Sequence, residues 1–103
     1  MGTALLGEVL SDWGRYELDD SIYFPAGKEA ALDINVSILP FDPMRKRVFK
    51  DQEYFIGIEQ IRDVVEGLEA QLGRTATLDE RLRAVVHYAR HDAFIDPRDA
   101  VGE

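Results

Sequence analysis

The segment from Ile58 to Leu72 constrains the fold most, because its apolar residues recur at the spacing of an amphipathic helix. At 100° per residue they share a face about 120° wide. Gly73 follows as a C-terminal stop. The pattern therefore predicts a helix over residues 58–72, with this inward face: Ile58, Ile61, Val64, Val65, Leu68 and Leu72.

A second helix is predicted from Thr77 to about His91 or Asp92. Thr77 and Glu80 have the spacing of a capping box, in which the side chain of each residue bonds the backbone N–H of the other. The predicted inward face consists of Leu78, Leu82, Val85, Val86 and Ala89.

The first half of the chain favours strands. Residues 32–39 alternate apolar and polar side chains, the period of a half-buried strand, and residues 21–24 and 54–56 offer two shorter strands. Residues 4–13 carry apolar residues at helical spacing. The order helix, three strands, helix, helix predicts an α+β domain with a small antiparallel three-stranded sheet and helices packed on one face.

Length and composition limit the classes of protein. A chain of 103 residues with 46% hydrophobic and 31% charged residues is expected to form one globular domain, 1–103, in which residues 97–103 are a frayed polar tail. The absence of cysteine excludes thiol catalysis and thiolate metal sites. No segment is typical of a signal peptide or membrane span, so a cytoplasmic protein without membrane contact is expected.

The net charge of −8 disfavours a nucleic acid as partner and favours a basic protein. Four acidic residues gather in the predicted connection from the first helix to the first strand, a pattern suited to docking a cationic protein. Simple solubility is the competing explanation. The predicted partner-binding residues are Asp12, Glu17, Asp19 and Asp20.

Two histidines on the last helix raise the question of a metal site. On a helical projection His87, His91 and Glu80 all fall on the side opposite the apolar stripe, so they form a candidate patch for zinc or nickel. The HExxH motif of metalloproteases is absent, and His91 near a helix C-terminus is also favoured by the macrodipole. The preferred explanation is that this segment closes the packing of the fold and leaves the two histidines exposed. No cofactor is predicted.

No catalytic residue is predicted, because the serines lack a nucleophile-elbow context and the glycines form no phosphate-binding motif. The segment MRKRVFK, with Arg45, Lys46, Arg47 and Lys50, is a modest nucleic-acid signal. A solvated loop whose charges balance nearby acids is favoured, with Phe49 as an anchor into the core.

Four segments carry a resemblance over nearly the whole chain: LGEVL, DDSIYFP, GIEQIRDVVEGLEAQ and TLDERLRAVVHYARHDAFID. They are similar to an uncharacterised family of small bacterial proteins, a domain of unknown function. The most recognisable part is the Asp-Ala-Phe-Ile ending at residues 92–95. We expect Phe94 and Ile95 to fold back from the helix end and bury against the sheet, while Asp92 stays exposed. The resemblance implies a bacterial origin and supplies no catalytic residues.

These observations favour a non-enzymatic protein-binding domain, by association an immunity-type inhibitor of a basic bacterial toxin. One alternative is a small metal-binding protein or metal-dependent enzyme that uses His87 and His91. Another is a regulatory or scaffolding subunit that joins a complex or a self-dimer through a strand edge or the basic loop.

Overall fold

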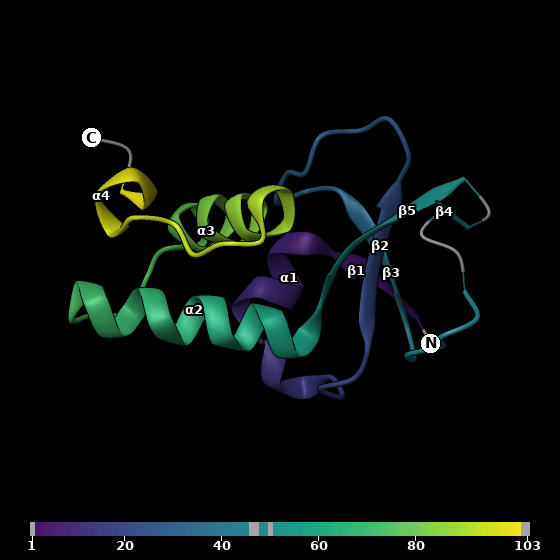
Figure 1. The fold of residues 1–103 in the computed structure, drawn as a ribbon, viewed down its shortest axis with the longest axis horizontal. Coiled ribbons are helices and arrows are strands. Elements are labelled where there is room, and N and C mark those ends of the chain that lie inside the picture. The colour runs from purple at the N-terminus through teal and green to yellow at the C-terminus, as the bar shows by residue number, and fades with distance from the viewer. Residues whose placement is uncertain (1, 46–47, 50, 102–103) are drawn as a thin grey trace.

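The structure is a computed structural model that describes residues 2–45, 48–49 and 51–101 (Figure 1). Its elements, in chain order, are β1 (Gly2–Leu5), α1 (Leu6–Ser11), the short 3-10 helix η1 (Trp13–Arg15), β2 (Ser21–Pro25), β3 (Asn35–Leu39), β4 (Val48–Phe49), β5 (Gln52–Gly57), α2 (Ile58–Leu72), α3 (Leu78–His91) and α4 (Pro97–Ala100). No helix within the described ranges has both the length and the apolar character needed to cross a membrane.

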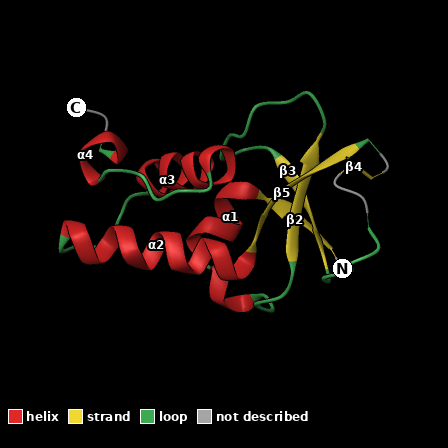
Figure 2. Ribbon diagram, viewed as in Figure 1, coloured by secondary structure: helices red, strands yellow, loops and turns green. Residues whose placement is uncertain are grey.

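The strands form one antiparallel sheet in the order β1-β3-β2-β5-β4, and the helices gather on one side of it (Figure 2). The predicted α+β class is therefore confirmed. The predicted three strands and the order α-β-β-β-α-α are wrong, because β1 precedes the first helix and the two-residue β4 is added at the far edge.

The first strand and helix share a stretch that the sequence assigned to one helix, residues 4–13. Gly2–Leu5 is extended because it pairs with β3, from Gly2 opposite Ile38 to Leu5 opposite Asn35. The chain then turns into α1, where the Gly7 N–H donates to the Leu32 carbonyl at 2.8 Å. A Cβ at Gly7 would lie 3.1 Å from that oxygen, a tight contact, so the close approach favours a glycine.

The core lies between the sheet and the three longer helices. Strand β3 begins at Asn35, three residues later than the strand predicted over residues 32–39, and Asp33 lies in a turn. Within β3, Val36 and Ile38 are buried while Asn35 is exposed. Ile22, Ile38 and Ile56 come from adjacent strands in register and meet the helices. The helical residues that complete the core include Leu6, Val9 and Leu10 of α1, Ile61, Val64, Val65 and Leu68 of α2, and Ala84 and Val85 of α3.

The two long helices begin and end as the sequence predicts. Helix α2 covers Ile58–Leu72 and ends at Gly73, whose φ of 72° is the left-handed conformation that glycine adopts without strain. The Thr77 hydroxyl caps α3 by accepting from the Glu80 N–H at 3.2 Å. Asp92 ends α3 with φ 53° and remains exposed, as expected of a polar terminator.

The chain after α3 differs from the expected frayed tail. Asp96 caps α4 by accepting from the Arg98 N–H at 2.9 Å, and Ala100 at the end of this helix is fully buried. The preceding Phe94 does not bury against the sheet. The residue is 61% exposed, and its ring lies beside that of Tyr88, with ring centroids 5.4 Å apart.

Candidate functional site

The four acidic residues predicted to bind a partner lie in the connection between α1 and β2. Asp12, Glu17 and Asp19 are exposed, and none has an ion pair within the described part of the chain. Asp20 is half-buried and differs from the others, because its carboxylate accepts from the Glu17 N–H at 3.2 Å and holds the turn. Three of the four carboxylates are thus available to a partner.

An exposed apolar residue lies between two of these acidic residues in the chain. Leu18 is 44% exposed between Glu17 and Asp19. Its carbonyl accepts from the Glu59 N–H at 3.1 Å, and the Asp20 carbonyl accepts from the Ile58 N–H at 2.9 Å. These bonds fix the connection to the first turn of α2. We call residues 12–20 the acidic loop.

The two histidines of α3 lie together, with ring centroids 4.6 Å apart. His91 is exposed, whereas His87 is half-buried. Both line a shallow cavity of about 350 Å³ that is open to solvent on the outer side of α3. The two histidines therefore lie on one face of α3, as the helical projection predicted.

The carboxylate of Glu80 is bonded within the protein and does not join the two histidines. Its carboxylate accepts two bonds of 2.8 Å from the Arg74 guanidinium and one of 2.8 Å from the Thr77 N–H, and only 8% of the residue is exposed. These bonds, first that of Arg74, lower the pKa of Glu80 to about 2. Across the described residues, no three His, Cys, Asp or Glu side chains are grouped to hold a metal ion. The predicted metal patch of Glu80, His87 and His91 is therefore not formed.

A second charged network, which was not predicted from the sequence, joins three helices. The Arg81 guanidinium donates to the Leu10 carbonyl at the end of α1 at 2.6 Å and to Glu69 Oε2 of α2 at 2.9 Å. Glu69 also accepts from the Ala76 N–H at 2.8 Å. Burial raises the pKa of Glu69, but the bonds from Ala76 and Arg81 outweigh burial, so the pKa lies below its usual value. The network holds the fold together and offers no open site.

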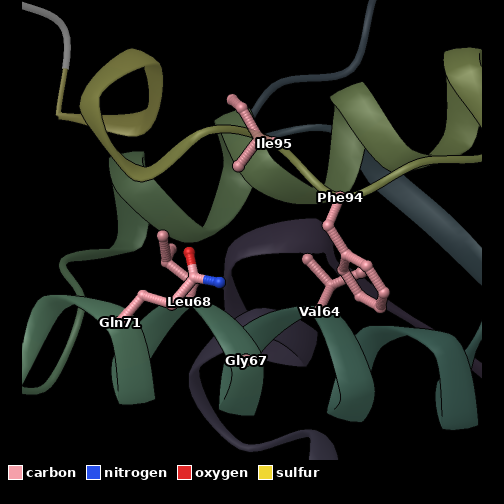
Figure 3. Close-up of a pocket in the computed structure, with 6 residues that line it drawn as sticks. All are labelled: Val64, Gly67, Leu68, Gln71, Phe94 and Ile95. Carbon is pink, nitrogen blue, oxygen red and sulfur yellow. The ribbon is translucent and has the colours of Figure 1, made fainter.

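The segment after α3 covers an apolar groove on α2. This groove, about 190 Å³ in volume, is lined by Val64, Gly67, Leu68, Gln71, Phe94 and Ile95. Figure 3 shows the Phe94 ring reaching toward α2 beside Val64, with Gln71 at the opposite end. The Asp-Ala-Phe-Ile ending thus packs toward α2 and not, as predicted, toward the sheet.

The basic segment is described only in part. Arg45 is tied to its own loop: it donates to the Pro40 carbonyl at 2.8 Å, pairs with Asp42 at 3.9 Å and lies 5.9 Å from the centroid of the Tyr23 ring. This agrees with a loop whose charges are balanced locally. Lys46, Arg47, Lys50 and the side chain of Phe49 lie outside the described part of the structure.

Comparison with known proteins places the chain in a family. Residues 3–97 match the family described as Domain of unknown function (DUF7716), and the chain belongs to that family. It matches no curated protein and no solved structure.

Proposed function

We propose that the protein acts by binding a cationic protein through the acidic loop. The observation that carries this proposal is the exposed Leu18, which Glu17 and Asp19 flank in the chain; these two carboxylates and that of Asp12 have no ion pair in the described chain. An apolar contact beside several unpaired carboxylates suits a protein interface, and Arg15 is the one basic residue of the loop. The apolar contact contributes affinity, and the charges contribute association rate and specificity.

The neighbouring face of α2 extends this surface without adding much free charge. Glu59, Asp63 and Glu66 are exposed, but Arg62 contacts Glu59 at 3.7 Å and Asp63 at 3.0 Å. Most of the available negative charge therefore belongs to the loop itself. A partner that approaches the loop with lysines or arginines meets carboxylates that give up no internal bond on binding.

Among binding functions, we propose inhibition of a basic bacterial toxin, with the protein in the role of an immunity-type inhibitor. The net charge of −8 and the unpaired carboxylates support this proposal. Neutralising a cationic enzyme needs a rigid acidic surface and no catalytic group of its own. The fixed anchoring of the loop on α2 supplies that rigidity.

The test is capture of partners from the host cell with immobilised protein, in which bound proteins are identified by mass spectrometry. A triple variant, Asp12→Lys, Glu17→Lys and Asp19→Lys, is compared with wild type and with a control that makes the same charge change elsewhere: Glu29→Lys, Asp33→Lys and Asp79→Lys. Leu18→Ser removes the apolar contact alone.

We expect a basic protein to be retained by wild type and by the control, and lost with the triple variant and at high salt. Purified with the protein, this partner should lose its own activity. Equal retention of that partner by the triple variant and the control would contradict the proposed surface. A captured partner whose activity is unaffected would contradict the inhibitor role.

A further inference from the structure

The outer face of α3 is basic, in contrast to the acidic chain as a whole. Arg83, His87, Arg90 and His91 follow one another at spacings of four, three and one residues. On a helix this places them on one stripe, with Cβ atoms of residues three or four apart separated by roughly 5–6 Å. The stripe is separate from the acidic loop: in Figure 1, α3 lies on one side of α2 and the connection between α1 and β2 on the other.

The basic stripe forms the wall of the 350 Å³ cavity described above. Leu82 and Val86 of α3 and Ile95 of the returning segment give the cavity an apolar part. Ile95 also lines the groove of Figure 3, so the segment that follows α3 separates the two hollows. The cavity therefore offers cationic and apolar contacts side by side.

The two arginines of this cavity are weakly engaged by the protein. The side chain of Arg90 has no ion pair or hydrogen bond within the described chain, and that of Arg83 donates one long bond of 3.4 Å to the Ala100 carbonyl. Arg74 and Arg81, by contrast, are bonded to carboxylates at 2.8 and 2.9 Å. The helix dipole explains basic residues in the last turn, where Arg90 and His91 lie, but not Arg83 two turns earlier.

The charges of the cavity favour an anion over a metal ion. A guanidinium remains protonated at all ordinary pH values, so Arg83 and Arg90 repel a dication held between the imidazoles. Asp99 is the single acidic residue lining the cavity in the described structure, and one carboxylate does not balance two arginines. A phosphate matches the planar donors of arginine, which bind it with two parallel hydrogen bonds.

We propose that this cavity binds a small organic phosphate. Its phosphate group is held by Arg83, Arg90 and the two histidines, and an apolar or aromatic body rests on Leu82, Val86 and Ile95. The proposal does not rest on the proposed function, because it concerns a different face and a different class of ligand. The protein then carries two separate sites, one for a protein and one for a small molecule.

The test is a titration of the protein with phenyl phosphate. Binding is monitored through the amide signals in two-dimensional NMR spectra. Phenol and inorganic phosphate serve as probes of the two halves of the ligand. The affected residues are identified by comparison of wild type with two double variants. One is Arg83→Gln with Arg90→Gln, and the control, with the same change in net charge, is Arg15→Gln with Arg62→Gln.

We expect phenyl phosphate to produce saturable shifts centred on α3 and Ile95, with weaker binding of inorganic phosphate and no saturable effect of phenol. The Arg83 and Arg90 variant should weaken binding at least about tenfold, because it removes charge-assisted hydrogen bonds to the phosphate. The control should bind as wild type does. Should Arg83→Gln disturb the packing of Ala100, Arg90→Gln alone gives the same comparison, since Arg90 has no bond to lose.

Equal affinity of the double variant and the control would overturn the proposal, as would shifts that map away from α3. Saturable binding of Zn²⁺ at His87 and His91, together with no response to phenyl phosphate, would replace the phosphate site by a metal site.

Discussion

Two stretches of this chain each carry five charged residues, but the structure uses them differently. In residues 69–81, Glu69 and Glu80 are partly or fully buried and bonded to Arg81 and Arg74. In the acidic loop, residues 12–20, three carboxylates are exposed and without an ion pair in the described structure.

The difference follows from what surrounds each stretch. Residues 69–81 span the connection between two packed helices, where carboxylates that leave water need a hydrogen-bonding partner. The acidic loop lies at the surface, where water solvates its carboxylates at no cost. The first set of charges therefore stabilises the fold, and the second is available for recognition. Substitution of the first set of charges should therefore lower stability much more than substitution of the second.

The largest expected effect is that of Arg81→Met on stability. The change leaves Glu69 with the Ala76 N–H alone and the Leu10 carbonyl without its donor, at a place where Arg81 is only 13% exposed. Removal of one partner of this partly buried ion pair should cost up to about 3 kcal/mol of the free energy of unfolding. Urea denaturation followed by circular dichroism measures the loss.

Arg15→Met is the matched control, because Arg15 is exposed and its guanidinium lies 6.0 Å from the Tyr16 ring without an ion pair in the described chain. It should change the free energy of unfolding by less than about 0.5 kcal/mol. Similar losses in both variants would remove the distinction between the two regions.

An intermediate effect is expected from Glu80→Gln, and it depends on pH. The pKa of Glu80 is lowered in the folded protein from 4.5 to about 2, so the unfolded chain takes up the proton first as the pH falls. The ionised carboxylate therefore contributes stability fully above pH 4.5, and this contribution disappears as the pH falls toward about 2.

Melting temperatures of wild type and Glu80→Gln, recorded between neutral pH and pH 2, test this expectation. Wild type should be more stable near neutral pH, and the difference should shrink through the acidic range, because glutamine does not titrate. Glu17→Gln, in the acidic loop, should differ little from wild type. A difference between wild type and Glu80→Gln that stayed constant with pH would show that the ion pair with Arg74 is not its cause.

The smallest effect on stability is expected for the acidic loop. Each of Asp12→Lys, Glu17→Lys and Asp19→Lys should change the free energy of unfolding by less than about 0.5 kcal/mol, because no bond to these carboxylates is lost. Asp20→Lys should cost more, since it removes the bond to the Glu17 N–H. Urea denaturation of the four single variants measures this ranking. If Asp20→Lys were the mildest of the four, the loop would not be held as described.

The sequence predicted the long helices well. The stripe of Ile58–Leu72 and the capping box of Thr77 and Glu80 depend on residues close in the chain, so local spacing is sufficient to recognise them. Strand β1 was missed because four residues without a clear alternation become extended only by pairing with β3. Helix α4 was missed because its burial depends on α2 and α3, which lie earlier in the chain.

The candidate sites show the same limit. A helical projection placed His87 and His91 on one face correctly, since that depends on the helix alone. It also placed Glu80 there as a free ligand, because a projection contains no information about the loop that brings Arg74 onto this carboxylate. The basic cavity on α3 was missed for the same reason: Ile95 and Asp99 reach it only after the chain reverses beyond α3.

By itself, then, the sequence determined the α+β class, the bounds of α2, the cap of α3, the excess of acidic residues and the spacing of the two histidines. All of these follow from side-chain periods and charges within a few turns of the chain. Only the tertiary structure decided which carboxylates are consumed by arginines, which remain open to a partner, and which basic residues share a cavity. Those outcomes depend on contacts between segments that are distant in the chain. Burial at such contacts determines whether a charged side chain stabilises the fold or remains available for binding.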